Sequence, residues 1–270
     1  LLLIGLGAAL VIGAGWGLRG ALLARIGAGL LAGGWIVGCL RRFWIGERRA
    51  LPAAEWELMR RLLLPMSLFT LSITLLFHFD RLLVRNFLTA DSGGYAVIVT
   101  LGSIPAYLVG SVIFVLFPLA AAEHARGQAL RTLHRQALLA GGAISLAAVI
   151  ALSLFSPWIV RLWNPAYLPY AGGVGLYAAA VGLQGLIQIT ATVEMARHRY
   201  AFLAALAPLT LGACAWLYLG RQHWTLNQIL WILIASRALI LIGMAAIAFS
   251  RRNPSSESIS RPASTDPSYP

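Results

Sequence analysis

The chain has 270 residues, of which 59% are hydrophobic and 11% are charged, and its mean hydropathy is +0.78. A water-soluble domain does not need so many apolar residues to fill its core, so this composition excludes an ordinary soluble protein and indicates a membrane protein. The net charge of +12 arises because the chain has 21 arginines, no lysine and only nine acidic residues. The arginines cluster in the gaps between apolar stretches. That distribution follows the positive-inside rule, so the charge does not indicate a nucleic-acid partner.

Apolar windows of about 20 residues predict an all-α, polytopic helical bundle. Eight membrane-spanning helices are expected, at residues 1–16, 20–40, 62–86, 93–121, 133–155, 170–193, 200–219 and 225–249. Fourteen arginines lie in the tail and in or beside the gaps after the second, fourth and sixth spans, against five in or beside the opposite set of connections. This asymmetry places the C-terminus in the cytoplasm. The first span opens at Leu1 without a methionine, which favours an N-terminally truncated sequence.

The connection 41–61 is the longest and the most charged, and it divides the chain. Trp44 and Trp56 are typical of a segment that lies along the membrane surface, so we expect an amphipathic linker on the cytoplasmic side. Beyond Asn253 the sequence is rich in serine and proline and predicts a disordered tail. The predicted parts are two helices in 1–43, the linker 44–61, a six-helix bundle in 62–250 and the tail 251–270.

The span 62–86 carries polar residues at helical spacing. They follow one another at intervals of 3, 4, 4, 3 and 4, which places them on one face of a helix: Ser67, Thr70, Thr74, His78, Arg81 and Arg85. Guanidinium groups are costly in hydrocarbon unless they face protein or water. We therefore predict that this face lines a polar cavity.

Two other spans carry polar residues for which cavity lining and helix packing both stay open. In 93–121 the hydroxyl groups recur at intervals of 3, 4 and 4, and two prolines, Pro105 and Pro118, can kink the helix: Thr100, Ser103, Tyr107 and Ser111. In 170–193, Tyr177, Gln184 and Gln188 share a face, and five glycines permit close approach of another helix. The side-chain amides of the two glutamines can hydrogen-bond sugar hydroxyls or a neighbouring helix, and the sequence favours neither.

Two charged residues require partners. Arg237 lies in the middle of the span 225–249, where an uncompensated charge costs about 2.5–3.5 kcal/mol or more. Candidates for compensation are Asp80, a backbone carbonyl, cavity water and an anionic ligand. Asp80 is the one acid in 62–86 and lies off the polar face, so it is expected to point at a neighbouring helix. There it either pairs with an arginine (Arg81, Arg85 or Arg237) or, near His78, serves as an ion-coupling site.

Signatures of catalysis are absent from the sequence. It contains no nucleophile elbow, zinc-protease motif, nucleotide-binding loop or dinucleotide fingerprint, and its two cysteines, Cys39 and Cys214, lie far apart in apolar segments. We therefore expect no enzymatic activity, no cofactor and no metal site.

Residues 62–96 resemble the oligosaccharide flippases of the multidrug/oligosaccharidyl-lipid/polysaccharide exporter superfamily. The likeness rests on Pro65 early in the helix, on Asp80-Arg81 and on the turn that ends in Gly94-Tyr95. VLFPLAA at 115–121 and the loop and Gly-rich helix at 155–186 are similar to later family segments. The resemblance implies two six-helix lobes around a central cavity. This chain would then hold the last two helices of the first lobe and the whole second lobe.

The implied function is to flip an undecaprenyl-diphosphate-linked oligosaccharide across the bacterial inner membrane for surface-polysaccharide assembly. Arg81, Arg85 and Arg237 would attract the diphosphate, while serine, threonine, tyrosine and glutamine side chains face the sugars. Membrane lipids, a polysaccharide polymerase and glycosyltransferases are the expected partners. Other hypotheses are a lipid II flippase, a multidrug or cation antiporter, and a non-transporting scaffold of a polysaccharide-assembly complex.

Overall fold

The computed structural model describes the backbone of residues 53–126 and 130–250, together with isolated helical positions between 27 and 38. Side chains are described for 62–126, for 130–247 and for the same isolated positions. The predicted spans 1–16 and 20–40, the linker as far as residue 52 and the tail 251–270 fall outside these ranges. The chain divides into two compact units, Leu1–Arg60 and Arg61–Pro270, and the second contains the bundle considered below.

The described part of the chain is all helical, as predicted. The elements are α3 (Ala53–Phe87), η2 (Thr89–Asp91), α4 (Ser92–Gly102), α5 (Ile104–Ala125), α6 (Arg131–Trp163), η3 (Pro165–Tyr170), α7 (Ala171–Ala196), α8 (Leu203–Leu219) and α9 (Leu226–Ser250). Helix α3 begins inside the segment predicted as a linker, so residues 53–61 continue directly into the following span.

Five helical segments in the described ranges are long and apolar enough to cross a membrane: Leu62–Phe87, Thr89–Ala125, Arg131–Trp163, Pro165–Ala196 and Leu226–Ile247. Helix α8 is apolar but has only 17 residues. These six elements coincide with the last six predicted spans. The total of eight stays a prediction, because the first two spans lie outside the described residues.

The second of these segments is broken in the middle, between α4 and α5. The break falls at Ser103, and Pro105 occupies the first turn of α5. A proline has no backbone N–H and its ring collides with the carbonyl four residues earlier, so the ladder of α4 cannot continue through it. The Ser103 hydroxyl donates to the Val99 carbonyl at 2.6 Å, which ties the end of α4 to its own last turn.

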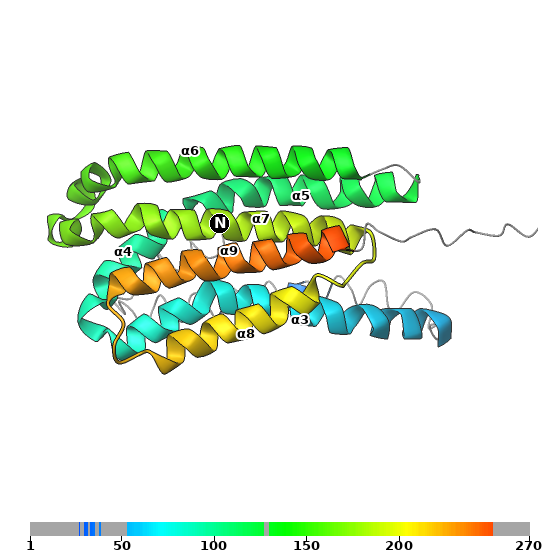
Figure 1. Ribbon diagram of the computed structural model, residues 1–270, viewed down its shortest axis with the longest axis horizontal. Coiled ribbons are helices and arrows are strands. Elements are labelled where there is room, and N and C mark those ends of the chain that lie inside the picture. The colour runs from blue at the N-terminus through cyan, green and yellow to red at the C-terminus, as the bar shows by residue number, and fades with distance from the viewer. Residues whose placement is uncertain are drawn as a thin grey trace, which may run out of the picture. The chain divides into compact units, whose positions relative to one another are not determined.

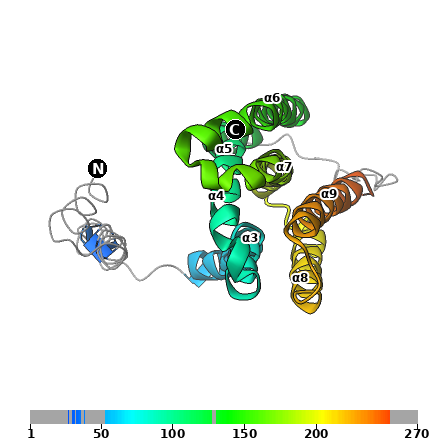
Figure 2. The same cartoon turned by 90° about the vertical axis from the view of Figure 1, so that its left-hand side faces the viewer.

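Helix α7 is the centre of the bundle. It packs against α4, α5, α6 and α9, and Figures 1 and 2 show it lying between α5–α6 on one side and α9 on the other. In the membrane-spanning segment that contains α7, 72% of an 18-residue apolar stretch is buried inside the bundle. In the other four segments the buried share of such a stretch does not exceed 33%. Its neighbours therefore shield α7 from the surroundings, which explains how it can hold polar residues away from lipid.

Small residues let α6 and α7 approach closely. A Cβ atom built on Gly175 would lie 2.2 Å from Ser153 Oγ, and one on Gly182 would lie 3.0 Å from Ser145 Cβ. Ser156 adds a hydrogen bond across the same seam, donating to the Ala171 carbonyl at 3.0 Å. Such contacts between small side chains are how helices associate where lipid and protein are equally apolar.

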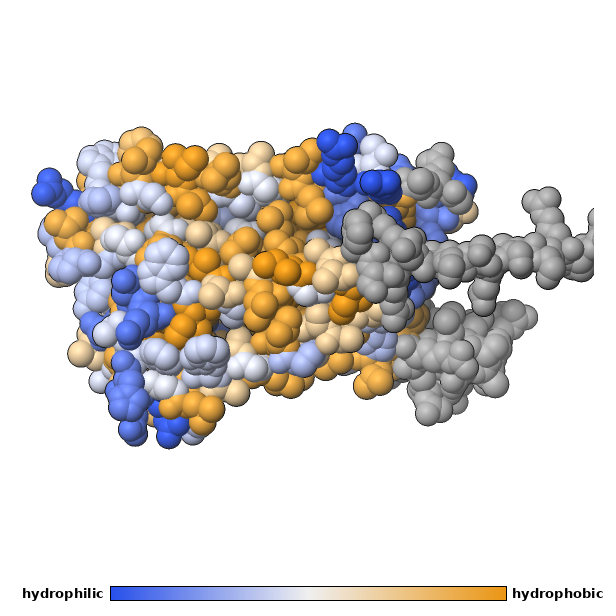
Figure 3. All heavy atoms as spheres, viewed as in Figure 1, coloured by the Kyte–Doolittle hydropathy of each residue, from blue (hydrophilic) through white to orange (hydrophobic). Residues whose placement is uncertain are grey.

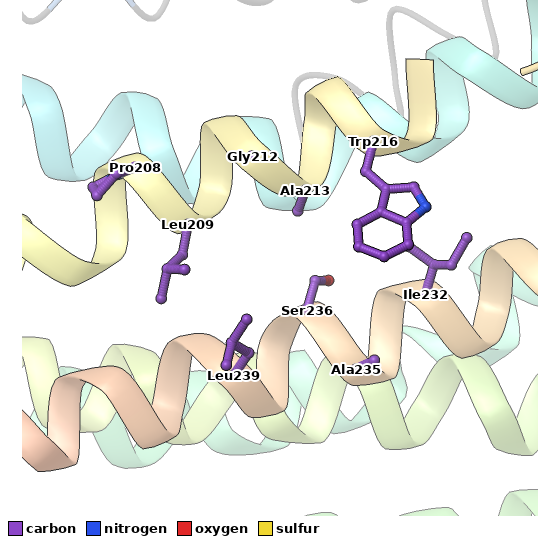
Figure 4. A pocket seen from close by; sticks show the side chains of 9 residues that line it. All are labelled: Pro208, Leu209, Gly212, Ala213, Trp216, Ile232, Ala235, Ser236 and Leu239. Atoms are coloured by element: carbon purple, nitrogen blue, oxygen red, sulfur yellow. The ribbon is translucent and has the colours of Figure 1, made fainter. Parts of the chain in front are cut away.

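The outer surface of the bundle matches a membrane environment. Figure 3 shows apolar residues over the middle of the face formed by α6, α7 and α9, with hydrophilic residues gathered toward the ends of the helices. Large apolar side chains stand exposed on several helices, including Phe114, Leu154 and Leu219. In water such a surface would favour aggregation, whereas in a bilayer it faces lipid.

Candidate functional site

The polar residues predicted to share one face of α3 are not covered by the other described helices. Thr70, Thr74, His78 and Arg85 are exposed and Arg81 is half-buried. The Thr70 hydroxyl donates to the Met66 carbonyl at 2.9 Å, so it needs no partner outside its own helix. The two arginines are therefore the groups on this face with the greatest capacity to bind a ligand.

Arg81 and Arg85 line a recess between α3 and α4, which we call the arginine recess. It has a volume of about 450 Å³, and its lining includes Ser92, Tyr95 and Thr100 from α4. No described carboxylate forms an ion pair with either arginine. The recess thus presents two cationic groups beside three hydroxyl-bearing residues, on segments that are apolar enough to cross a membrane.

Asp80 lies behind this recess and points into the bundle. Only 1% of it is exposed, and its Oδ2 atom accepts a short hydrogen bond from the hydroxyl of Tyr95 in α4. No ion pair with an arginine was found for this carboxylate among the described residues. The partner of Asp80 is therefore a tyrosine hydroxyl rather than the guanidinium group considered from the sequence.

Arg237 is completely buried in the middle of α9, as its position in the sequence indicated. Its Nη2 atom donates to the backbone carbonyl of Leu76 in α3 at 2.7 Å, which is one of the compensations expected. Its Nε and Nη1 atoms have no partner among the described residues. Arg237 and Asp80 both act electrostatically on the hydroxyls of Tyr95 and Tyr177, so the two opposite charges share one neighbourhood.

Asp80 and Arg237 belong to a group of buried polar residues that also contains Gln184 and Thr210; we call these four residues the polar layer. Each comes from a different helix, and none is more than 1% exposed. The apolar core consists of several clusters, and two of them lie on either side of these polar residues. On α3, Asp80 lies between Leu76 of one cluster and Leu83 of the other, and on α9, Arg237 lies between Ile240 of the first and Leu233 of the second. The polar layer thus separates two apolar parts of the core.

The polar layer is incompletely hydrogen-bonded within the described part of the chain. Gln184 lacks partners for both its oxygen and its nitrogen, Thr210 lacks one for its hydroxyl, and Asp80 lacks one for Oδ1. Each buried polar group without a partner costs on the order of 1–3 kcal/mol. These buried groups of α3, α7 and α8 therefore have hydrogen-bonding capacity that the described protein groups do not use.

The remaining predicted site residues do not join the arginine recess. Ser103 is buried and bound to its own helix, Tyr107 is 77% exposed, and Gln188 is half-buried on α7. Gln184 lies in the polar layer, in the core. The structure therefore brings Arg81 and Arg85 together with Thr100 and buries Asp80, Gln184 and Arg237 in the core.

Two residues of this region were missed as participants by reasoning from the sequence. Tyr95 entered only as part of a turn, and the partnership of its hydroxyl with Asp80 depends on how α4 is rotated against α3. Thr210 stands alone in an apolar helix, where a hydroxyl group is commonly satisfied by its own backbone. A signal was present for Tyr95, because a buried acid requires a donor on the adjacent span.

Comparison of the chain with protein-family models, with curated proteins and with solved structures finds no match. The arginine recess and the polar layer are therefore the features of the molecule that bear on its function.

Proposed function

We propose that the protein is a membrane transporter that flips a lipid-linked oligosaccharide carrying a diphosphate, with the arginine recess as part of the path of the headgroup. The observation that carries the proposal is the pair Arg81 and Arg85, which line a recess of about 450 Å³ without a described carboxylate partner. Guanidinium groups bind phosphate oxygens through charge-assisted, bidentate hydrogen bonds.

The surroundings of the two arginines support a glycolipid rather than a small anion. Ser92 and Thr100 line the same recess, and Thr70 and Thr74 continue along the exposed face of α3. The hydroxyls of Ser92, Thr100 and Thr70 each donate to a nearby backbone carbonyl, so their oxygens remain as acceptors for sugar hydroxyls while the lipid chain stays in the membrane. The recess would open to the two sides of the membrane in turn, by rocking of one helical bundle against another.

The wider setting is part of the same proposal. The protein would have about eight spans in this sequence, a cytoplasmic C-terminus and a place in the bacterial inner membrane, where polysaccharide polymerases and glycosyltransferases act on the same lipid. A lipid II flippase differs only in the sugar. A multidrug or cation antiporter is less well supported, because the one buried acid in 62–87 is bound by Tyr95 and shares its neighbourhood with Arg237.

The test is binding and transport by the full chain in nanodiscs and proteoliposomes. The ligand is a fluorescent undecaprenyl-diphosphate oligosaccharide, and its dephosphorylated counterpart is the neutral comparison. Arg81→Ala and Arg85→Ala are each expected to weaken binding of the diphosphate form about tenfold or more, since a hydrogen bond to a charged group contributes about 1.5–3 kcal/mol. Neither variant should change the weaker binding of the neutral form.

Arg161→Ala is the matched control, because Arg161 is an exposed arginine in the last turn of α6 and lies outside the recess. It should bind and transport as the unaltered chain does. Equal binding of diphosphate and neutral forms, or full activity in both recess variants, would refute the proposed role. Tolerance of alanine along the whole α3 face would favour a scaffold instead.

A further inference from the structure

A second groove lies on another face of the bundle, between α6 and α9 and above α7. Its volume is about 760 Å³, and the residues that line it come from these three helices: Arg131, Thr132, His134, Arg135, Leu138, Leu139, Leu186, Thr190, Leu241 and Ala245. Figure 1 shows α6 and α9 lying on either side of α7, and both pack against it. None of these residues lines the arginine recess.

The lining changes character along the groove. Arg131 and Arg135 lie in the first turns of α6, one helical turn apart, and both are exposed. Leu138 and Leu139 follow on the same side of α6, because residues three, four, seven and eight positions apart share a helical face. The α6 wall is therefore cationic at the end of the helix and apolar further in.

The other two walls extend the apolar part. Leu241 and Ala245 are one turn apart on α9, and Leu186 and Thr190 are one turn apart on α7. The Thr190 hydroxyl donates to the Leu186 carbonyl at 3.0 Å, so it makes no demand for water. Apart from the residues of the first turns of α6, the groove therefore offers a ligand only apolar contacts and one hydroxyl that is already bonded.

We propose that this groove binds an anionic phospholipid, with its phosphate at Arg131 and Arg135 and a hydrocarbon chain along Leu138, Leu186 and Leu241. The walls belong to segments that are long and apolar enough to cross a membrane, so the apolar part of the groove faces hydrocarbon and the arginines lie at headgroup level. Basic pockets between membrane-spanning helices are suited to anionic headgroups.

The lining also argues against other occupants. A soluble anion such as inorganic phosphate would use the arginines but leave the apolar walls without a partner. A neutral lipid would fill the walls but give the guanidinium groups no counter-charge, and no acidic residue among those that the structure describes lines the groove. Only a ligand with a negative head and an apolar chain matches both ends.

The experiment compares phosphatidylglycerol with phosphatidylcholine on the full chain, using native mass spectrometry and lipid titration in neutral-lipid nanodiscs. Arg131→Gln/Arg135→Gln should lower phosphatidylglycerol binding by about 25-fold, because each of the two basic residues near the anionic headgroup contributes about a factor of five. Arg126→Gln/Arg199→Gln is the matched control, since it removes two exposed arginines outside the groove. It should leave binding unchanged.

The apolar half is tested separately. Ala245→Phe places a ring in the groove and should reduce phosphatidylglycerol binding, whereas Ala246→Phe, at an exposed neighbour outside the lining, should not. Glycerol phosphate, which has the headgroup charge but no chain, should fail to displace the lipid. Circular dichroism checks that each variant folds. If Ala245→Phe loses helical structure, the proposal is tested by the arginine variants instead.

The proposal is overturned if both arginine pairs lose binding equally, if phosphatidylcholine binds as tightly as phosphatidylglycerol, or if glycerol phosphate displaces the lipid. Normal binding by a folded Ala245→Phe variant would also overturn it. Because these measurements use ordinary phospholipids and no transport assay, they succeed or fail independently of the proposed flipping activity.

Discussion

The carboxylate of Asp80 in α3 is held by the hydroxyl of Tyr95 in α4, in a contact from which solvent is excluded. The tyrosine ring in turn meets the ring of Tyr177 edge to face, with 6.1 Å between ring centroids. Three helices are thus joined around one buried acid. The contact pairs the buried carboxylate with a neutral donor, while Arg237 acts on the same tyrosine hydroxyl without forming an ion pair with Asp80 among the described residues.

Tyr95→Phe should destabilise the protein, because it removes the hydrogen bond that Asp80 accepts from the tyrosine hydroxyl and leaves the ring in place. The expected loss is about 1–3 kcal/mol in the free energy of unfolding, the cost of a buried polar group without a partner. Unfolding in mixed micelles monitored by circular dichroism measures it. Tyr107→Phe is the control, since Tyr107 is 77% exposed and should show no change.

Arg237→Met and Asp80→Asn should each destabilise the protein, and the double variant should lose less stability than the sum of the two single losses. Removing one charge leaves the opposite charge in an apolar core, which costs about 3–5 kcal/mol. The double variant leaves no charge in the polar layer and should recover part of the loss. A double-mutant cycle of unfolding free energies gives the coupling, and strict additivity would show that the two charges do not interact.

Hydropathy and charge predicted much of the fold, because the lengths of membrane spans follow from bilayer thickness and backbone hydrogen bonding. The six spans from residue 62 onward correspond to observed helices, and Pro105 coincides with the break between α4 and α5. Helical periodicity also placed Arg81 and Arg85 on one face, and they line one recess. These features are local, and local spacing is what a single sequence contains.

The polar layer could not be predicted, because it depends on contacts between helices distant in the sequence. Arg237 bonds to a carbonyl 161 residues away, and Gln184 faces the core although its spacing fits a cavity equally well. Spacing determines which residues share a face but not which neighbour covers that face. Tyr95 illustrates the limit, since its rotation toward Asp80 is fixed by the packing of α4 on α7.

Gly102→Ala should destabilise the bundle where α4 meets α7. A Cβ atom at this position would lie 2.8 Å from the ring of Tyr177 and 3.1 Å from the carbonyl oxygen of Val174. The carbonyl belongs to the backbone and cannot rotate away, so the expected cost is about 1–3 kcal/mol. Gly110→Ala is the contrasting variant, because nothing lies within 4 Å of its added Cβ.

Gly110→Ala and Gly102→Ala should change the free energy of unfolding in opposite directions. Gly110 lies inside α5, where alanine is favoured over glycine by about 0.5–1 kcal/mol, so Gly110→Ala should stabilise the protein slightly. Thermal unfolding followed by circular dichroism in detergent compares the two variants directly. A loss of stability in both, or in neither, would contradict the close approach of α4 and α7.

Gly94→Ala should destabilise the protein only when residue 170 carries an aromatic ring. The Tyr170 hydroxyl donates to Asp91 Oδ1 at 2.9 Å and so connects η3 with the turn before α4. A Cβ atom on Gly94 would lie 2.4 Å from this ring, which would have to move and give up that hydrogen bond. We expect Gly94→Ala to cost about 1–3 kcal/mol in the free energy of unfolding.

Tyr170→Ala supplies the test, because it removes the ring that the new methyl group would strike. In that background Gly94→Ala should cost little, so the double-mutant cycle should give a coupling of about 1–3 kcal/mol with the sign of a relieved clash. Tyr170→Phe separates the two contributions, because it keeps the ring and loses only the hydrogen bond to Asp91. If Gly94→Ala costs the same with and without the ring, the turn before α4 does not pack on η3.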